Sequence, residues 1–118
     1  MIVRFRGHRT GREYSTPVRY MLCDELIYSF SNRETQWWRN LLEETLIKLK
    51  IKGKEGPYIA HAVLDVAMIR PMLLQMLNAF PQDASYHGLT LDSAGSPDRD
   101  ELDNTLIDTV MVVAKSLN

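Results

Sequence analysis

The sequence predicts a mainly β protein with short helices inserted between its strands, in which the sheet forms a closed or split barrel. Three observations favour this fold class. Several segments alternate apolar and polar residues, which is the periodicity of a strand with one buried face. These segments follow one another through short turns, as in antiparallel hairpins. Helical periodicity is confined to short stretches and lacks the regular strand–helix alternation of a doubly wound sheet.

The first three strands are expected in the N-terminal part of the chain. Residues 2–6 alternate apolar and cationic side chains, which predicts a short, half-exposed strand. A glycine-bearing segment then leads into a second strand over residues 16–23, with Pro17 near its start, where a missing N–H donor is tolerated. An Asp-Glu pair turns the chain tightly into residues 26–30, so the second and third strands are expected to form a hairpin.

A short helix and a second hairpin are expected next. Thr35 is placed to cap a helix over residues 37–42, where apolar residues recur at helical spacing. Residues 45–52 alternate strictly, which predicts a strand with one buried face. A turn over residues 53–57 then returns the chain into another strand, at residues 58–65.

The C-terminal half combines two helices with the remaining strands. Residues 66–80 switch to helical periodicity, and Pro71 fits best in the first turn of that helix. Residues 89–92 fit a brief strand, and residues 99–106 fit a short helix. The β-branched residues of 109–115 predict a final strand. The chain is therefore expected to hold about six strands.

The composition is that of an ordinary globular protein. With 118 residues, of which 45% are hydrophobic and 25% charged, a single domain over residues 1–118 is expected. The single cysteine, Cys23, cannot form an intramolecular disulfide, and a chain without disulfides fits the cytoplasm. No apolar run approaches the roughly 20 residues that span a bilayer, and the N-terminus lacks the layout of a signal peptide. A membrane span is therefore not expected.

Charge is distributed unevenly along the chain, although the formal net charge is only −1. Residues 1–58 hold eleven lysine and arginine residues against seven acidic residues, whereas residues 59–118 hold three against eight. The basic first half favours an anionic ligand in that half. The weak overall charge argues against nucleic-acid binding, for which a strongly basic domain is expected.

Residues 4–17 form the most basic part of the chain and carry its strongest functional signal. They contain four arginines, one histidine and two glycines, and they connect two predicted strands. Glycine allows the tight backbone path of such a turn, and arginine donates forked hydrogen bonds suited to phosphate or carboxylate. This pattern favours a turn that holds the anionic tail of a cofactor. The alternative is a solvated cationic hairpin without a ligand.

Two adjacent tryptophans provide a second signal. Trp37 and Trp38 lie in a predicted short helix, so their side chains point about 100° apart and cannot both face the same core. One can be buried while the other lines a cavity, where its face would support a flat heteroaromatic ring. Ser31 and Asn32, in the preceding loop, would add polar contacts near that wall. The alternative is that both tryptophans belong to a core or a dimer interface.

Other chemistries have little support in the sequence. The three histidines are scattered and show no metal-ligand spacing with Cys23 or the carboxylates, so no metal site is expected. No nucleophile elbow, P-loop or G-x-G-x-x-G motif is present. The acidic residues of 98–103 are explained most simply as favourable charges at the start of a helix.

Several segments together resemble a known family. These are residues 7–12 (GHRTGR), 15–17 (STP), 29–32 (SFSN), 37–41 (WWRNL) and 80–88 (FPQDASYHG). In this order they resemble the sequence pattern of the deazaflavin-dependent nitroreductase family, over nearly the whole chain. That family is similar to the wider group of split-barrel flavin proteins that includes the pyridoxamine-phosphate oxidases.

The resemblance implies a fold and an activity. The fold would be a six-stranded antiparallel split β-barrel of the FMN-binding type, and by analogy with small split barrels a homodimer is expected. The activity would be that of an oxidoreductase that passes a hydride from a reduced 8-hydroxy-5-deazaflavin coenzyme to a small organic acceptor, such as a quinone or a nitroaromatic compound.

The resemblance also assigns roles to residues of this chain. The implied cofactor-binding residues are Arg9, Thr10, Arg12, Ser31, Asn32, Gln36 and Trp37. The first three would hold the phosphate and anionic tail, the next two would approach the phosphate or the ring edge, and the last two would border the ring. Tyr86 lies where the family places tyrosines near the acceptor, and it is the expected catalytic proton donor.

The chain also departs from the family pattern. His8 replaces the usual arginine, Tyr14 stands where a further basic residue is common, and the loop from Ser31 to Trp37 is shorter and lacks a lysine. No counterpart of the family's N-terminal helix is found. Two alternatives therefore stay open: an FMN-dependent reductase, and a non-catalytic split-barrel binding protein that has lost the cofactor.

Overall fold

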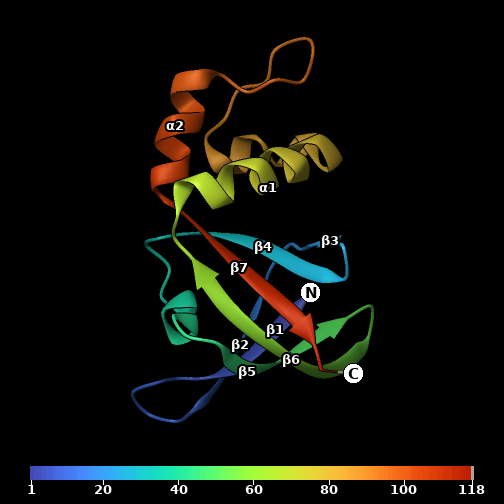
Figure 1. Ribbon diagram of the computed structural model, residues 1–118, viewed down its shortest axis with the longest axis vertical. Helices are drawn as coiled ribbons and strands as arrows, with labels where there is room; N and C mark the ends of the chain where they lie inside the picture. The colour runs from blue at the N-terminus through green and yellow to red at the C-terminus, as the bar shows by residue number, and fades with distance from the viewer. Residues whose placement is uncertain (118) are drawn as a thin grey trace. The chain divides into compact units, whose positions relative to one another are not determined.

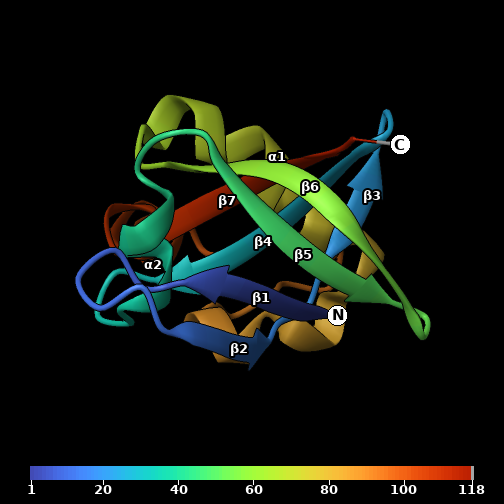
Figure 2. The same ribbon diagram turned by 90° about the horizontal axis from the view of Figure 1, so that it is seen from below.

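The computed structural model describes residues 1–117, and it confirms a mainly β protein with short helices. Over that range seven strands form one antiparallel sheet that is not closed, in the order β2-β1-β5-β6-β7-β4-β3 (Figures 1 and 2). The strands are β1 (Ile2–Arg6), β2 (Glu13–Pro17), β3 (Met21–Cys23), β4 (Leu26–Asn32), β5 (Thr45–Ile51), β6 (Lys54–Val63) and β7 (Thr109–Ser116).

The prediction of a single strand over residues 16–23 is wrong. This stretch contributes to two strands, β2 and β3, which lie at opposite edges of the sheet. Strand β2 pairs with β1 through Val3 and Thr16, whereas β3 pairs with β4 through Met21 and Tyr28. A local pattern of strand-forming residues does not reveal which partner each part will bond. The structure therefore has two strands where one was expected.

Tight turns confirm the two predicted hairpins. Between β3 and β4, Asp24 and Glu25 both take positive φ, at 49° and 68°. Between β5 and β6, Lys52 and Gly53 do the same, at 51° and 83°. Two consecutive residues with positive φ are the signature of the turn that matches the twist of antiparallel strands. Strand β6 begins at Lys54, so the second turn is shorter than expected.

The short helix η1 (Trp37–Leu41) is a 3-10 helix, and Thr35 does not cap it. The residue before the helix is Gln36, whose side chain makes no capping hydrogen bond. The Thr35 hydroxyl instead donates to the carbonyl of Asn32, at 2.8 Å, and closes the turn that follows β4. The predicted cap is wrong because a threonine hydroxyl can satisfy a preceding carbonyl as easily as a helix N–H.

The structure divides into two compact units. The first unit holds Met1–Val63 and the chain from Val110 onward, and the second holds Leu64–Thr109. The first unit has one buried cluster to which β1, β4, β5, β6, β7 and η1 all contribute. Since β1 and β4 stand near opposite edges of the sheet, the sheet curls around this cluster (Figure 2). Its central members are Val3, Phe5, Trp38, Leu41, Leu49 and Val112.

The second unit holds the helices α1 (Val66–Ala79), η2 (Pro81–Asp83), η3 (Ser85–His87) and α2 (Arg99–Ile107). The Asp65 carboxylate accepts from the backbone N–H of Ala67 at 2.9 Å and caps α1. Pro71 therefore lies in the second turn, not in the first as expected, because the helix begins at Val66. The strand expected over residues 89–92 is reduced to one isolated bridge, between Leu91 and Pro97.

His87, in the second unit, predicts a pH dependence of stability. Burial lowers the pKa of its imidazole below the ordinary 6.5, and the nearby Asp83 carboxylate opposes part of this change. Just below pH 6.5 the unfolded chain therefore binds more protons than the folded protein, so the free energy of unfolding decreases as the pH falls through this window.

We expect this free energy to fall, from about pH 7.5 to about pH 5.5, by more in the wild type than in His87→Gln. Urea unfolding curves of both proteins at the two pH values measure the difference. An identical change in the two proteins would contradict a contribution from His87.

Candidate functional site

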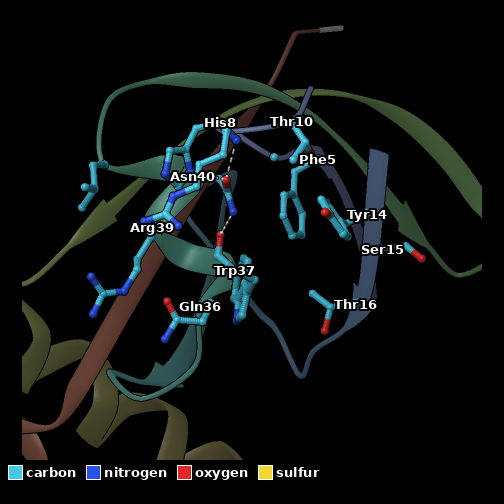
Figure 3. Close-up of a pocket in the computed structure, with 13 residues that line it drawn as sticks. Phe5, His8, Thr10, Tyr14, Ser15, Thr16, Gln36, Trp37, Arg39 and Asn40 are labelled. Atoms are coloured by element: carbon cyan, nitrogen blue, oxygen red, sulfur yellow. Dashed lines mark hydrogen bonds between the residues drawn. The ribbon is translucent and has the colours of Figure 1, made fainter. Parts of the chain in front are cut away.

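An open cavity of about 710 Å3 lies entirely within the first unit. Its walls are formed by β1 and β2, by the turn that joins them, and by the segment from Gln36 to Leu42 (Figure 3). The basic turn and the tryptophan helix are far apart in sequence, yet they meet at this cavity. The two strongest functional signals of the sequence therefore converge on one site.

Three aromatic rings form one wall of the cavity, which we call the aromatic wall (Phe5, Tyr14 and Trp37). The rings of Phe5 and Tyr14 stack with centroids 5.9 Å apart and an interplanar angle of 26°. The Trp37 ring lies 6.2 Å from the Phe5 ring, tilted by 42° (Figure 3). The indole N–H of Trp37 donates to the Ser31 hydroxyl oxygen at 3.1 Å, which fixes the orientation of the indole. Such a wall suits a flat, apolar ring system.

Trp38 has a different environment from its neighbour. It is only 5% exposed and belongs to the buried cluster of the first unit. Its indole N–H is buried and has no hydrogen-bond partner among residues 1–117. The guanidinium of Arg39 lies 5.0 Å from the centre of the Trp38 ring. The expected division of the pair, with one tryptophan buried and the other on a cavity wall, is confirmed in its geometry.

The polar side of the cavity is basic, and we call it the basic rim (His8, Arg9 and Arg39). The Thr10 hydroxyl lies beside it on the same turn. No aspartate or glutamate occurs among the residues that line the cavity. The two arginines are cationic donors with no carboxylate among the lining residues, so they favour an anionic group in the cavity.

Two glycines shape the turn that carries His8 and Arg9 of the basic rim. Gly11 takes a φ of 68°, a conformation that glycine adopts without strain. The Gly7 N–H donates to the carbonyl of Arg12 at 2.8 Å, and the Gly11 N–H donates to the carbonyl of Gly7 at 2.9 Å. A side chain at Gly7 would place its Cβ 2.8 Å from a ring carbon of Tyr14. Glycine at this position therefore lets the aromatic wall approach the turn.

Asn40 ties the turn to η1. Its side-chain oxygen accepts from the backbone N–H of His8 at 2.8 Å and lies 2.7 Å from Nδ1 of the same residue. Its amide nitrogen donates to the carbonyl of Trp37 at 2.9 Å (Figure 3). One side chain therefore holds the first residue of the basic rim against the helix that carries Trp37 of the aromatic wall.

Four of the seven predicted cofactor-binding residues line the cavity, namely Arg9, Thr10, Gln36 and Trp37. The other three (Arg12, Ser31 and Asn32) do not line it and form hydrogen bonds with other residues of the first unit. The backbone N–H of Arg12 donates to the Thr10 hydroxyl at 3.2 Å. Ser31 holds the Trp37 indole, as described above, and the Asn32 side-chain oxygen accepts from the backbone N–H of Glu34 at 2.8 Å.

Tyr86, the expected proton donor, belongs to the second unit and is not among the residues that line the cavity. It is 79% exposed, and its ring meets the His87 ring edge-on with centroids 5.2 Å apart. Its predicted catalytic role therefore stays a prediction.

The sequence reasoning missed several residues of the cavity. Phe5 and Tyr14 stand directly opposite each other in the β1–β2 pair, and they form most of the aromatic wall. Their pairing could have been found by placing the glycine-bearing turn at the centre of a hairpin over residues 2–17. Asn40 gave no such signal, because its role depends on a turn 32 residues earlier in the chain.

Within residues 1–117, no group of three or more His, Cys, Asp or Glu side chains could hold a metal ion, and no helix is long and apolar enough to cross a membrane. No protein-family model matches the chain, and no curated protein matches it either. The cavity is therefore the feature of the molecule that points to a function.

Proposed function

We propose that the protein is an oxidoreductase that binds a flavin-type cofactor, either 8-hydroxy-5-deazaflavin coenzyme or FMN, in the cavity of the first unit. The observation that carries this proposal is the pairing of an aromatic wall with a basic rim across one cavity. A flavin-type cofactor has the complementary parts, a flat heteroaromatic ring and a phosphate-bearing tail. The curled antiparallel sheet is in keeping with a split barrel, which is the fold the family resemblance implies.

The residues present fit such a group. The cavity volume of about 710 Å3 lies within the 300–1,000 Å3 or so that small-molecule sites commonly span. Arginine is the side chain best suited to the geometry of phosphate, and the Thr10 hydroxyl adds a donor that can rotate toward it. The absence of carboxylates from the lining favours a ligand with a negative charge.

The residues have separate roles in this proposal. Arg9 and Thr10 bind the phosphate, Trp37 supports one face of the ring, and Gln36 donates or accepts a hydrogen bond at its edge. The bound cofactor supplies the hydride chemistry, and the protein supplies binding and orientation. Leu42, which is 57% exposed and lines the same cavity, offers an apolar surface to a small organic acceptor. A homodimer, as expected for small split barrels, belongs to the same proposal.

Turnover tests the proposal. The purified protein is mixed with reduced deazaflavin coenzyme, or in parallel with reduced FMN, and with a quinone or nitroaromatic acceptor under anaerobic conditions. We expect oxidation of one cofactor to accelerate with protein concentration, and Trp37→Ala to lower this rate. Rates equal to the protein-free background with both cofactors would contradict an oxidoreductase. Tight binding of a flavin without turnover would favour the non-catalytic binding protein instead.

A further inference from the structure

His8 and Asn40 are the two residues of the cavity that share the closest polar contact. In the family resemblance His8 stands in place of a cationic arginine, and Asn40 was not predicted as a site residue. Both line the cavity, and neither has a carboxylate neighbour among the lining residues. Some polar atoms of this pair already hydrogen-bond within the protein, and the others are available to a ligand.

The hydrogen bonds fix the orientation of the Asn40 amide from two sides. Its nitrogen donates to the carbonyl of Trp37 at 2.9 Å, and a carbonyl can only accept. Its oxygen accepts from the backbone N–H of His8 at 2.8 Å, and a backbone N–H can only donate. Both contacts demand the same orientation, so the oxygen faces His8.

The orientation of Asn40 in turn fixes the tautomer of His8. Because the amide oxygen has no proton, Nδ1 of His8, at 2.7 Å, must carry one and donate it. This bond forms equally with the neutral and with the protonated imidazole. Nε2 is therefore the only ring nitrogen that can gain or lose a proton while the Asn40 contact persists.

We propose that Nε2 of His8 contacts the anionic group of the ligand. Asn40 is the positioning residue: its side-chain oxygen holds the proton on Nδ1 and so leaves Nε2 available for the ligand. Proton uptake at Nε2 turns it from an acceptor into a cationic donor, so an anion binds most strongly to the protonated ring. The other charged or titratable groups on the cavity are Arg9, Arg39 and Tyr14, and no carboxylate there competes for the imidazole. The ligand's identity rests on the proposed function, whereas the assignment of the ring nitrogens does not.

The ring nitrogens can be observed directly, without any ligand. Long-range proton–nitrogen NMR spectra distinguish a protonated from an unprotonated imidazole nitrogen, and the His8→Asn variant identifies the His8 signals among those of the three histidines. Above the range in which imidazoles ordinarily titrate, we expect the wild-type His8 to carry its proton on Nδ1. Asn40→Ala should shift the proton toward Nε2. A proton on Nε2 in the wild type, or no change in Asn40→Ala, would overturn the positioning role.

The ligand contact is tested with FMN and the same variant. The amide nitrogen of asparagine stands as many bonds from Cβ as Nδ1 does, so His8→Asn keeps a donor toward Asn40 but lacks Nε2. We expect it to weaken FMN binding by about tenfold near pH 6, as for the loss of one charge-assisted hydrogen bond. His61→Asn, outside the cavity, is the matched control. Equal affinity of His8→Asn and wild type near pH 6 would overturn the contact.

If the wild type binds neither flavin, the proposed function fails but this inference is still decided. Inorganic phosphate then replaces FMN as the probe, and the His8 nitrogen signals are followed near pH 6. A saturable shift that is larger at Nε2 than at Nδ1 supports an anion site at His8. The absence of any shift at millimolar phosphate overturns it.

Discussion

Replacing Trp38 with alanine is expected to lower the free energy of unfolding by about 3–5 kcal/mol, because this side chain is almost fully buried in the main cluster of the first unit. Trp37→Ala is expected to cost only about 1–2 kcal/mol, since that ring is half-buried and loses chiefly its packing on Phe5 and its hydrogen bond to Ser31. Urea unfolding of the two variants gives both values.

The same pair is expected to separate in the opposite sense in ligand binding. Trp37→Ala should weaken flavin binding by about 10- to 100-fold, which corresponds to the loss of one stacking platform. Where Trp38→Ala remains folded at low temperature, its affinity should stay within about threefold of the wild type. Equal destabilisation by the two substitutions, together with unchanged affinity in Trp37→Ala, would show that Trp37 serves the core.

Replacing Arg9 with alanine is expected to weaken the binding of FMN by about 10- to 100-fold, because a charge-assisted hydrogen bond to phosphate contributes about 1.5–3 kcal/mol. Binding of riboflavin, which lacks the phosphate, should change by less than about threefold. Titration of the wild type and the variant with both ligands measures the two ratios.

Arg12→Ala is the matched control for Arg9→Ala. Both residues belong to the same turn, but Arg9 lines the cavity and Arg12 does not. The Arg12 contacts made by its backbone, to Gly7 and Thr10, survive the substitution. We therefore expect FMN affinity to change by less than about threefold, through the loss of a distant charge only. A larger effect of Arg12→Ala than of Arg9→Ala would place the phosphate elsewhere on the turn.

The parts of the fold that could be predicted from sequence are those set by local periodicity. In β5, Ile47 and Leu49 are buried while Leu46 and Lys48 are exposed, as strict alternation requires. The hairpin turn at Lys52 and Gly53 follows from the ends of that alternation. Such features depend on neighbours in sequence, so the chain reveals them without its tertiary structure.

One error arose where distant partners decide the structure, and another where two local hydrogen bonds compete for the same side chain. The stretch from Thr16 to Cys23 divides because its two ends bond different strands at opposite edges of the sheet. The Thr35 hydroxyl was assigned to a helix that it does not cap, since the turn after β4 offers it a carbonyl first. Neither choice is visible in the propensity of the residues themselves.

In the candidate site, too, some features could be predicted from local sequence and others depend on contacts between distant parts of the chain. Helix geometry alone predicted that the two tryptophans face different directions, but it did not decide which of them is buried or whether the other lines a cavity. The basic turn could be recognised from its arginines and glycines. Phe5 and Tyr14 meet only through the register of β1 and β2, and Asn40 reaches His8 only in the folded chain. These contacts could be identified only from the structure.

The most direct test of the central claim is a fluorescence-quenching titration with deazaflavin coenzyme and, in parallel, with FMN. The intrinsic probe is Trp37, and Trp37→Phe keeps an aromatic ring on the wall while removing that probe. We expect saturable quenching by one of the two ligands at about micromolar concentration or below, with a smaller amplitude in Trp37→Phe. No saturable quenching by either ligand, or the same amplitude in the variant, would contradict flavin binding in this cavity.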